Sequence, residues 1–333
     1  MQLRTHHTRF ARSRAQVPEA KREWGVRRPR TALLASATTT IASTAIALAA
    51  AAGPQTARAD AACVPADQAS PDEGSQASLD THLGTSLGTN LAATWSDAGA
   101  LILSDGRRFV PEGIALPSRL ASDAALPRAA ERAVQTALQS CLVRPGAGRM
   151  DRHGRWSAAG WLSCPARHDL AEEDLATALL RAGAGYAQPT AQDGSCLPQR
   201  LAAETQTRAA RRGIWAEPSA VAPAADEQAM AIHAGLFTVA EGRVLAAGGT
   251  QDRIFLNFGS SWRQDFTAMM EREDFATIMG DSLEPAMLRG TLVRVRGVVR
   301  AEGGPAMMLR QPGEIALLAG TEARAVRAKR GGE

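Results

Sequence analysis

The chain has 333 residues, 45% of them hydrophobic, which is enough apolar material to build two globular domains. Its formal net charge of +4 is concentrated at the N-terminus, because residues 1–59 hold ten of the 38 Lys and Arg residues but only two of the 34 Asp and Glu residues. Residues 60–333 therefore carry 28 basic and 32 acidic residues, a net charge of −4, which excludes a strongly basic nucleic-acid-binding protein.

The first 59 residues have the pattern of an export signal. Three arginines between positions 27 and 30 precede an uncharged stretch over residues 31–52 that is rich in alanine and threonine. A small-residue cleavage motif follows at residues 57–59, or at 59–61. The paired arginines permit a twin-arginine route, although the residues around them match that signal poorly. We therefore expect residues 1–59 to be removed and the mature chain to be periplasmic or secreted, with no permanent membrane span.

All four cysteines lie beyond this segment, and an even number in an exported chain fits two disulfides, with three possible connectivities. If the strands predicted over residues 142–149 and 155–163 are antiparallel neighbours, Cys141 and Cys164 meet at their ends. This favours Cys141–Cys164 and, by remainder, Cys63–Cys196. No Cys-x-x-Cys pair or Cys/His cluster indicates a zinc site.

Residues 60–91 have the composition of an acidic, flexible linker without Lys or Arg. Beyond them, a hairpin is predicted around the turn at residues 104–107. Helices are predicted over residues 126–139, 169–182 and 197–212, the second with Asp169 as its N-cap. Two further strands flank a turn at Gly154.

The run Asp151-Arg152-His153-Gly154-Arg155 forms that turn and places an arginine at the start of the second strand. An arginine fixed in this way suits a phosphate group, because its planar guanidinium matches the phosphate oxygens and keeps its charge. The simpler interpretation is a surface turn with a solvated arginine. Arg155 is therefore a candidate catalytic or anion-binding residue, and Arg152 is a second binding candidate.

Together these features resemble the staphylococcal nuclease-like (thermonuclease) family over residues 92–217. The resemblance rests on the Asp105-Gly106-Arg107 hairpin, the Gly113-Ile114…Pro117 turn, the Asp151–Arg155 run, the helix ending at Gly183-x-Gly185-Tyr186, and the closing stretch from Glu204 to Trp215. It implies a mainly β fold with α-helices (α+β), in which an OB-type five-stranded barrel packs with three helices. It also implies calcium-dependent cleavage of DNA and RNA.

Most of that family's catalytic positions hold other residues in this chain. The resemblance places metal ligands at Gly99 and Ala115, a neighbour of the second ligand at Leu116, a cation at Val110 and the general base at Ser118, so that Arg155 and the outer acid Asp97 alone match. The charged residues near these positions are Glu112, Arg119, Asp105 and Asp123. We interpret them as exposed loop charges rather than substitutes, because Glu112 and Arg119 are out of register and Asp105 suits a turn. No metal site is therefore expected.

Residues 218–229 are predicted to form a Pro/Ala linker, and residues 230–320 a second, strand-rich domain. Five strands are expected over residues 235–246, 253–258, 265–270, 291–300 and 305–318, with a short helix over 272–280. This pattern predicts a second OB-like barrel. It also resembles the small OB-type domain that follows nuclease-like domains in some bacterial exported proteins, through Leu256-Asn257-Phe258-Gly259 and Val295-Arg296-Gly297. Residues 321–333 form a polar tail.

Along the fourth of these strands, Arg294, Arg296 and Arg300 alternate with valines and are expected on one face. OB folds bind oligonucleotides through such residues together with aromatic side chains, which here would be Phe255, Phe258 and Trp262. The favoured interpretation is a solvated arginine row and phenylalanines in the core, with Arg294 and Arg296 kept as binding candidates.

We therefore expect an exported protein with disulfides whose thermonuclease-like domain is catalytically inactive and serves as a binding or scaffold module in the cell envelope. Nucleic acid or another anionic polymer is the expected weak partner, an envelope protein is a second candidate, and no cofactor is expected. The alternative is a Ca²⁺-dependent endonuclease with relocated metal ligands. A third interpretation is an assembly factor whose second domain is the working part.

Overall fold

The computed structural model describes Cys63 and residues 89–96, 99–117, 124–166, 172–261 and 264–318. The predicted export signal, most of the acidic stretch and the polar tail lie outside the described residues. Within the described part of the chain, no helix is long and apolar enough to cross a membrane.

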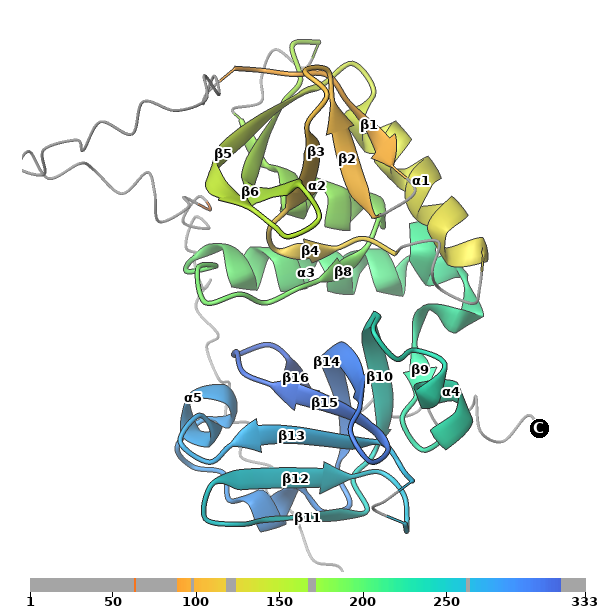
Figure 1. Cartoon of the computed structure of the whole chain (residues 1–333), viewed down its shortest axis with the longest axis vertical. Helices are drawn as coiled ribbons and strands as arrows, with labels where there is room; N and C mark the ends of the chain where they lie inside the picture. The colour runs from red at the N-terminus through yellow and green to blue at the C-terminus, as the bar shows by residue number, and fades with distance from the viewer. Residues whose placement is uncertain are drawn as a thin grey trace, which may run out of the picture. The chain divides into compact units, whose positions relative to one another are not determined.

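The first half of the chain folds around a curled sheet (Figure 1). Its strands are β1 (Ala93–Ser96), β2 (Ala100–Leu103), β3 (Arg108–Pro111), β6 (Arg155–Ser163) and β5 (Leu142–Met150), in that spatial order. β3 and β6 are parallel, and the other neighbours are antiparallel. Leu91, just before β1, pairs with Val143 of β5, so the two outer strands meet and the sheet has a barrel-like curl. Three short strands complete this half: β7 (Glu173–Asp174) pairs with β6, and β4 (Ile114–Ala115) with β8 (Tyr186–Ala187).

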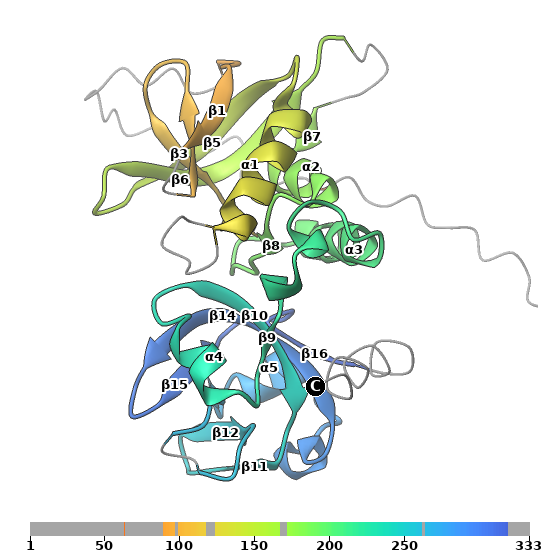
Figure 2. The same ribbon diagram turned by 90° about the vertical axis from the view of Figure 1, so that its right-hand side faces the viewer.

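Three helices pack against this barrel: α1 (Ala125–Leu138), α2 (Leu175–Ala182) and α3 (Cys196–Ala209) (Figure 2). α1 buries Leu126, Ala130 and Val134, which recur at helical spacing on one face, as the sequence predicts. Phe109 of the barrel and Leu179 of α2 are fully buried in one shared core. The expected mixture of mostly strands with a few helices is therefore present.

The helix predicted over residues 169–182 begins later in the structure, at Leu175. Asp174 is the N-cap of α2, because its carboxylate accepts hydrogen bonds from the backbone N–H (2.8 Å) and the hydroxyl (2.6 Å) of Thr177. Glu173 and Asp174 form β7 instead of a first helical turn. The predicted cap, Asp169, lies outside the described residues.

The predicted Pro/Ala linker over residues 218–229 is folded. It contains the short helix η3 (Pro218–Ala220), the strand β9 (Ala222–Pro223) and the start of α4 (Glu227–Ala231), and it follows η2 (Gly213–Ala216). β9 pairs in parallel with β10, and Ala220, Ala222 and Ala224 are buried. Because its side chains are small, this segment packs closely against β10. The Pro/Ala composition that suggested a flexible linker therefore belongs to a packed segment.

The second half folds around another curled sheet. It is built from β10 (Phe237–Arg243), β11 (Ala246–Gly249), β12 (Arg253–Asn257), β13 (Thr267–Glu271), α5 (Phe275–Met279), η4 (Pro285–Leu288), β14 (Leu292–Ala301), β15 (Pro305–Leu309) and β16 (Ile315–Leu317). The spatial order is β11-β12-β13-β15-β14-β10-β9, with β16 beside β14. Four of the five predicted strands and the short helix are present near their expected positions. The fifth, residues 305–318, is divided into β15 and β16 by a turn in which Gly313 has a φ of 86°.

Both disulfides pair as the sequence analysis favoured. Cys141 and Cys164 join the start of β5 to the end of β6, and Cys63 joins Cys196 at the first residue of α3. Disulfides persist in oxidising compartments, which agrees with an extracellular or periplasmic environment.

Candidate functional site

Arg155 opens β6 and is held by the turn before it. Gly154 has a φ of 68°, a conformation that favours glycine. The Asp151 carboxylate accepts hydrogen bonds from the backbone N–H groups of His153 (2.8 Å) and Arg155 (3.0 Å) and from Nε of Arg155 (2.7 Å). The backbone N–H of Arg155, followed by its guanidinium, lowers the pKa of Asp151 to about 2. The side chain is thus fixed through Nε, and in the described part of the chain its two Nη atoms have no acceptor.

A pocket of about 320 Å³ lies beside Arg155. The parallel pairing of β3 with β6 sets Val110 opposite Ser157, and the pairing of β4 with β8 sets Ala115 opposite Tyr186. Residues from the segment that leads into β10 and from β10 itself complete the wall. The lining residues are Gly99, Val110, Ile114, Ala115, Leu116, Pro117, Leu126, Arg155, Tyr186, Gln188, Ser219, Ala220, His233, Gly235, Leu236, Phe237 and Thr238. Among these, Arg155 is the one Arg, Lys, Asp or Glu.

The structure brings together the positions that the sequence analysis compared with a nuclease site. Val110, Ala115, Leu116 and Gly99 line the same pocket as Arg155. At each of these positions the residue is apolar or lacks a side chain, so none offers a side-chain ligand for a metal ion. Asp97 and Ser118 lie outside the described residues, as do Arg119 and Asp123.

The two nearby acids that the structure describes have other partners. Glu112 does not line the pocket, and its carboxylate accepts a long hydrogen bond from the hydroxyl of Ser157 (3.4 Å). Asp105 accepts hydrogen bonds from the backbone N–H (3.0 Å) and Nε (2.6 Å) of Arg107, which is the turn role expected for it. Nowhere in the described ranges do three or more His, Cys, Asp or Glu side chains gather in a group that could hold a metal ion.

Arg152 is exposed at the tip of the β5–β6 hairpin, and its Nε donates to Nε2 of His153 (3.1 Å). It does not line the Arg155 pocket. The two binding candidates of this run are therefore different: Arg155 is held beside a pocket, and Arg152 lies on the open surface.

The expectation of a solvated arginine row on the second barrel is wrong for Arg294 and Arg296. Arg294 is 7% exposed and Arg296 is 4% exposed. Nε of Arg294 donates to Glu241 (2.8 Å), and Arg296 donates to Glu204 of α3 and to the carbonyl of Ala187 (3.0 Å). Both guanidinium groups are thus buried in ion pairs and cannot form a surface for nucleic acid. Arg300, further along β14, is exposed.

The aromatic candidates of the second barrel also lie in different environments. Phe258 is 1% exposed and stacks on Phe266 in the core, with ring centroids 5.3 Å apart. Phe255 is half-buried and lines a groove on the outer face of the barrel. Trp262 lies outside the described residues.

His233 lines the Arg155 pocket, but no motif in the sequence marks it, because it reaches the pocket through a long-range contact. Burial lowers the pKa of His233 below its ordinary value. The neutral form is therefore favoured at neutral pH, and Arg155 supplies the positive charge of the pocket.

The lowered pKa of His233 predicts an acid-dependent loss of stability. In the unfolded chain His233 binds a proton near its ordinary pKa of about 6.5, whereas the folded chain resists protonation to lower pH. Lowering the pH from 8 to 5 should therefore favour unfolding, and His233→Gln should reduce this dependence. Urea midpoints of both proteins at the two pH values test it, and equal changes in midpoint would show that His233 makes no contribution.

No protein-family model and no curated protein matches the chain. Among solved structures, the chain is similar to the aspartyl-tRNA synthetase from Entamoeba histolytica, with 15% identity, a TM-score of 0.22, and coverage of 29% of this chain and 21% of the synthetase. It is also similar to two OBodies bound to hen egg-white lysozyme, each with 20% identity, a TM-score of 0.20, and coverage of 26% of this chain and 84% of the OBody. The chain thus spans about a fifth of the synthetase, and similarities this low define neither its fold nor its function.

Proposed function

We propose that the chain is an exported, non-catalytic relative of the thermonucleases that binds an anionic group, such as a phosphate of a nucleic acid or another anionic polymer, at the Arg155 pocket. Localisation outside the cytoplasm is part of this proposal. It is supported by the two disulfides and by the signal-like composition of residues 1–59.

The strand connections support the OB part of the proposal. In each half, the first strand lies beside the second and the fourth, and the third strand is parallel to the fifth. A helix follows the third strand in both halves, α1 in the first and α5 in the second. In the second half the first strand consists of β10 and β11. This order and helix placement are those expected of an OB-type barrel.

The main support for anion binding without catalysis is the set of residues that line the Arg155 pocket. Phosphodiester cleavage of the thermonuclease type needs oxygen ligands for a metal ion and a carboxylate that acts as general base on the attacking water. The described wall offers a single guanidinium and otherwise neutral or apolar groups. Such a site can hold an anion through the Nη donors of Arg155, but those residues include no carboxylate to ligate a metal ion or to deprotonate the attacking water.

Binding and cleavage can be tested with one matched pair of variants. We expect no digestion of plasmid DNA or RNA with calcium or with chelator. Arg155→Ala should weaken binding of a fluorescein-labelled single-stranded oligonucleotide about tenfold, because it removes one charge-assisted hydrogen bond. Arg152→Ala is the control, because it removes a neighbouring arginine that does not line the pocket.

Two results would refute this proposal. An oligonucleotide affinity of the Arg155→Ala protein equal to that of the wild type would show that the pocket binds no anion. Chelator-sensitive cleavage that Arg155→Ala abolishes and Arg152→Ala preserves would establish the endonuclease alternative instead.

A further inference from the structure

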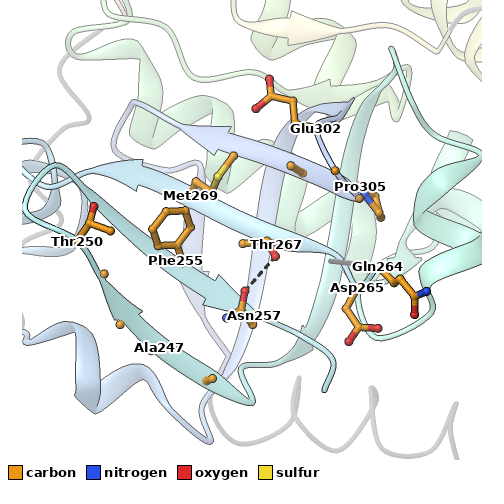
Figure 3. Close-up of a pocket in the computed structure, with 16 residues that line it drawn as sticks. Ala247, Thr250, Phe255, Asn257, Gln264, Asp265, Thr267, Met269, Glu302 and Pro305 are labelled. Carbon is orange, nitrogen blue, oxygen red and sulfur yellow. Dashed lines mark hydrogen bonds between the residues drawn. The ribbon is translucent and has the colours of Figure 1, made fainter. Parts of the chain in front are cut away.

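The second barrel carries a groove of about 1100 Å³ on its outer face (Figure 3). The floor is formed by β11, β12 and β13, and the turn between β14 and β15 borders it. Ile254, Leu256 and Met270 lie in the barrel core. Because side chains alternate along a strand, the residues between them face outward and form the groove floor.

Strand register arranges these outward residues in two rows. Gly248, Phe255 and Met269 are direct cross-strand neighbours in one row, and Ala246, Asn257 and Thr267 are neighbours in the next. The outer face of an antiparallel sheet is ordinarily solvated and polar. Neither row contains a charged residue, and the Phe255 ring has only a glycine opposite it on β11. A concave and mostly apolar surface of this kind is typical of a ligand-binding site.

One polar pair interrupts the apolar floor. The hydroxyl of Thr267 donates to Oδ1 of Asn257 (2.9 Å), as the dashed line in Figure 3 marks. This bond fixes the amide, and its two N–H donors have no partner in the described part of the chain. They are suited to a carbonyl oxygen of a ligand.

The charged residues among the described lining are both acidic, Asp265 and Glu302. Arg300 lies 3.5 Å from Glu302, but both side chains are about half exposed, so this pair is weak. Arg253 belongs to the next row, where it pairs with Glu271 at 3.3 Å, and it does not line the groove. A phosphate backbone would therefore meet carboxylates, whereas a basic side chain would meet complementary charge.

We propose that this groove binds an extended polypeptide segment in which an apolar side chain neighbours a Lys or Arg. The apolar side chain packs on Phe255 and Met269, a backbone carbonyl accepts from Asn257, and the basic side chain meets the exposed carboxylate of Glu302. The groove and the Arg155 pocket share no lining residue, so either proposal can fail without the other.

Fluorescence anisotropy of the purified protein with three labelled probes tests this proposal. The probes are an eight-residue peptide with two leucines and two lysines among alanines and serines, the same peptide with glutamates in place of lysines, and an eight-nucleotide oligothymidylate. We expect the lysine peptide to bind at least about tenfold more tightly than the glutamate peptide, because both charged residues of the described lining are acidic. Competition with unlabelled oligothymidylate should not displace it.

Three variants locate the binding. Gly248→Leu adds a side chain on the groove floor where a Cβ would meet no heavy atom within 4 Å, so it should block the groove without disturbing the barrel. Glu302→Lys reverses an exposed rim charge and should weaken the lysine peptide and strengthen the glutamate peptide. Glu273→Gln removes an exposed acid of the same barrel that does not line the groove and should change neither affinity.

No binding of the lysine peptide, or binding that persists in both Gly248→Leu and Glu302→Lys, would overturn the proposal. So would preferential binding of oligothymidylate that Gly248→Leu abolishes, since the groove would then be a nucleic-acid site.

Discussion

Arg200→Met is expected to lower the free energy of unfolding by about 3–5 kcal/mol, the cost of leaving buried charges without a partner. Nε and Nη2 of Arg200 donate to the two carboxylate oxygens of Asp174 at 3.0 and 2.8 Å, and Nη1 donates to Asp193. All three side chains are at most 4% exposed. Removing the guanidinium leaves two buried carboxylates, and urea unfolding monitored by circular dichroism measures the loss.

The position of Arg200 shows why this loss should be large. The guanidinium ties α3 to the N-cap of α2 and to the loop before Cys196. It also lies directly under Gly113, where a Cβ would approach Nη1 to 2.1 Å. Arg132→Met on the exposed face of α1 is the control and should change stability by less than about 0.5 kcal/mol. Equal effects of the two substitutions would show that the buried cluster has no special role.

Arg296→Met is expected to lower the free energy of unfolding by about 3–5 kcal/mol as well, because it leaves the buried carboxylate of Glu204 without its ion-pair partner. Arg296 lies on β14 and Glu204 on α3, and both side chains are at most 5% exposed. In a second ion-pair set, Arg294 of β14 and Arg208 of α3 surround Glu241 of β10, with N···O distances of 2.8 and 2.7 Å. These contacts join the helix of the first half to the strand of the second.

The double variant Arg296→Met/Glu204→Leu separates charge burial from packing. Replacing both partners by apolar residues removes the unpaired charge, so most of the single-variant loss should be recovered. Urea unfolding of the wild type, both single variants and the double variant completes the cycle. A double variant as unstable as the sum of the single variants would mean that the pair is not coupled.

Periodic patterns in the sequence predicted most of the helices and strands. The apolar spacing around Ala130 and Val134 predicted α1, and the turn at Gly154 predicted the β5–β6 hairpin with Cys141 and Cys164 at its two ends. The start of α2 was not predictable, because Asp169 and Asp174 are equally good caps by residue type. The hydrogen bond to Thr177 decides between them only once the fold is formed.

The main feature that could not be predicted from the sequence was which charged residues are buried. A row of arginines alternating with valines looks the same whether it faces water or an ion-pair partner. The partners of Arg294 and Arg296 are Glu241 and Glu204, which lie 53 and 92 positions away. The same holds for the candidate site: the local run from Asp151 predicted Arg155, but His233 and Phe237 reach the pocket through the tertiary fold.

The most direct test of the central claim, that the described lining of the Arg155 pocket holds a guanidinium but no carboxylate, is calorimetric titration of the purified protein with calcium chloride. We expect no saturable heat up to about 10 mM calcium, which exceeds the dissociation constants of weak extracellular calcium sites. A saturable heat corresponding to one calcium ion per chain would contradict the claim.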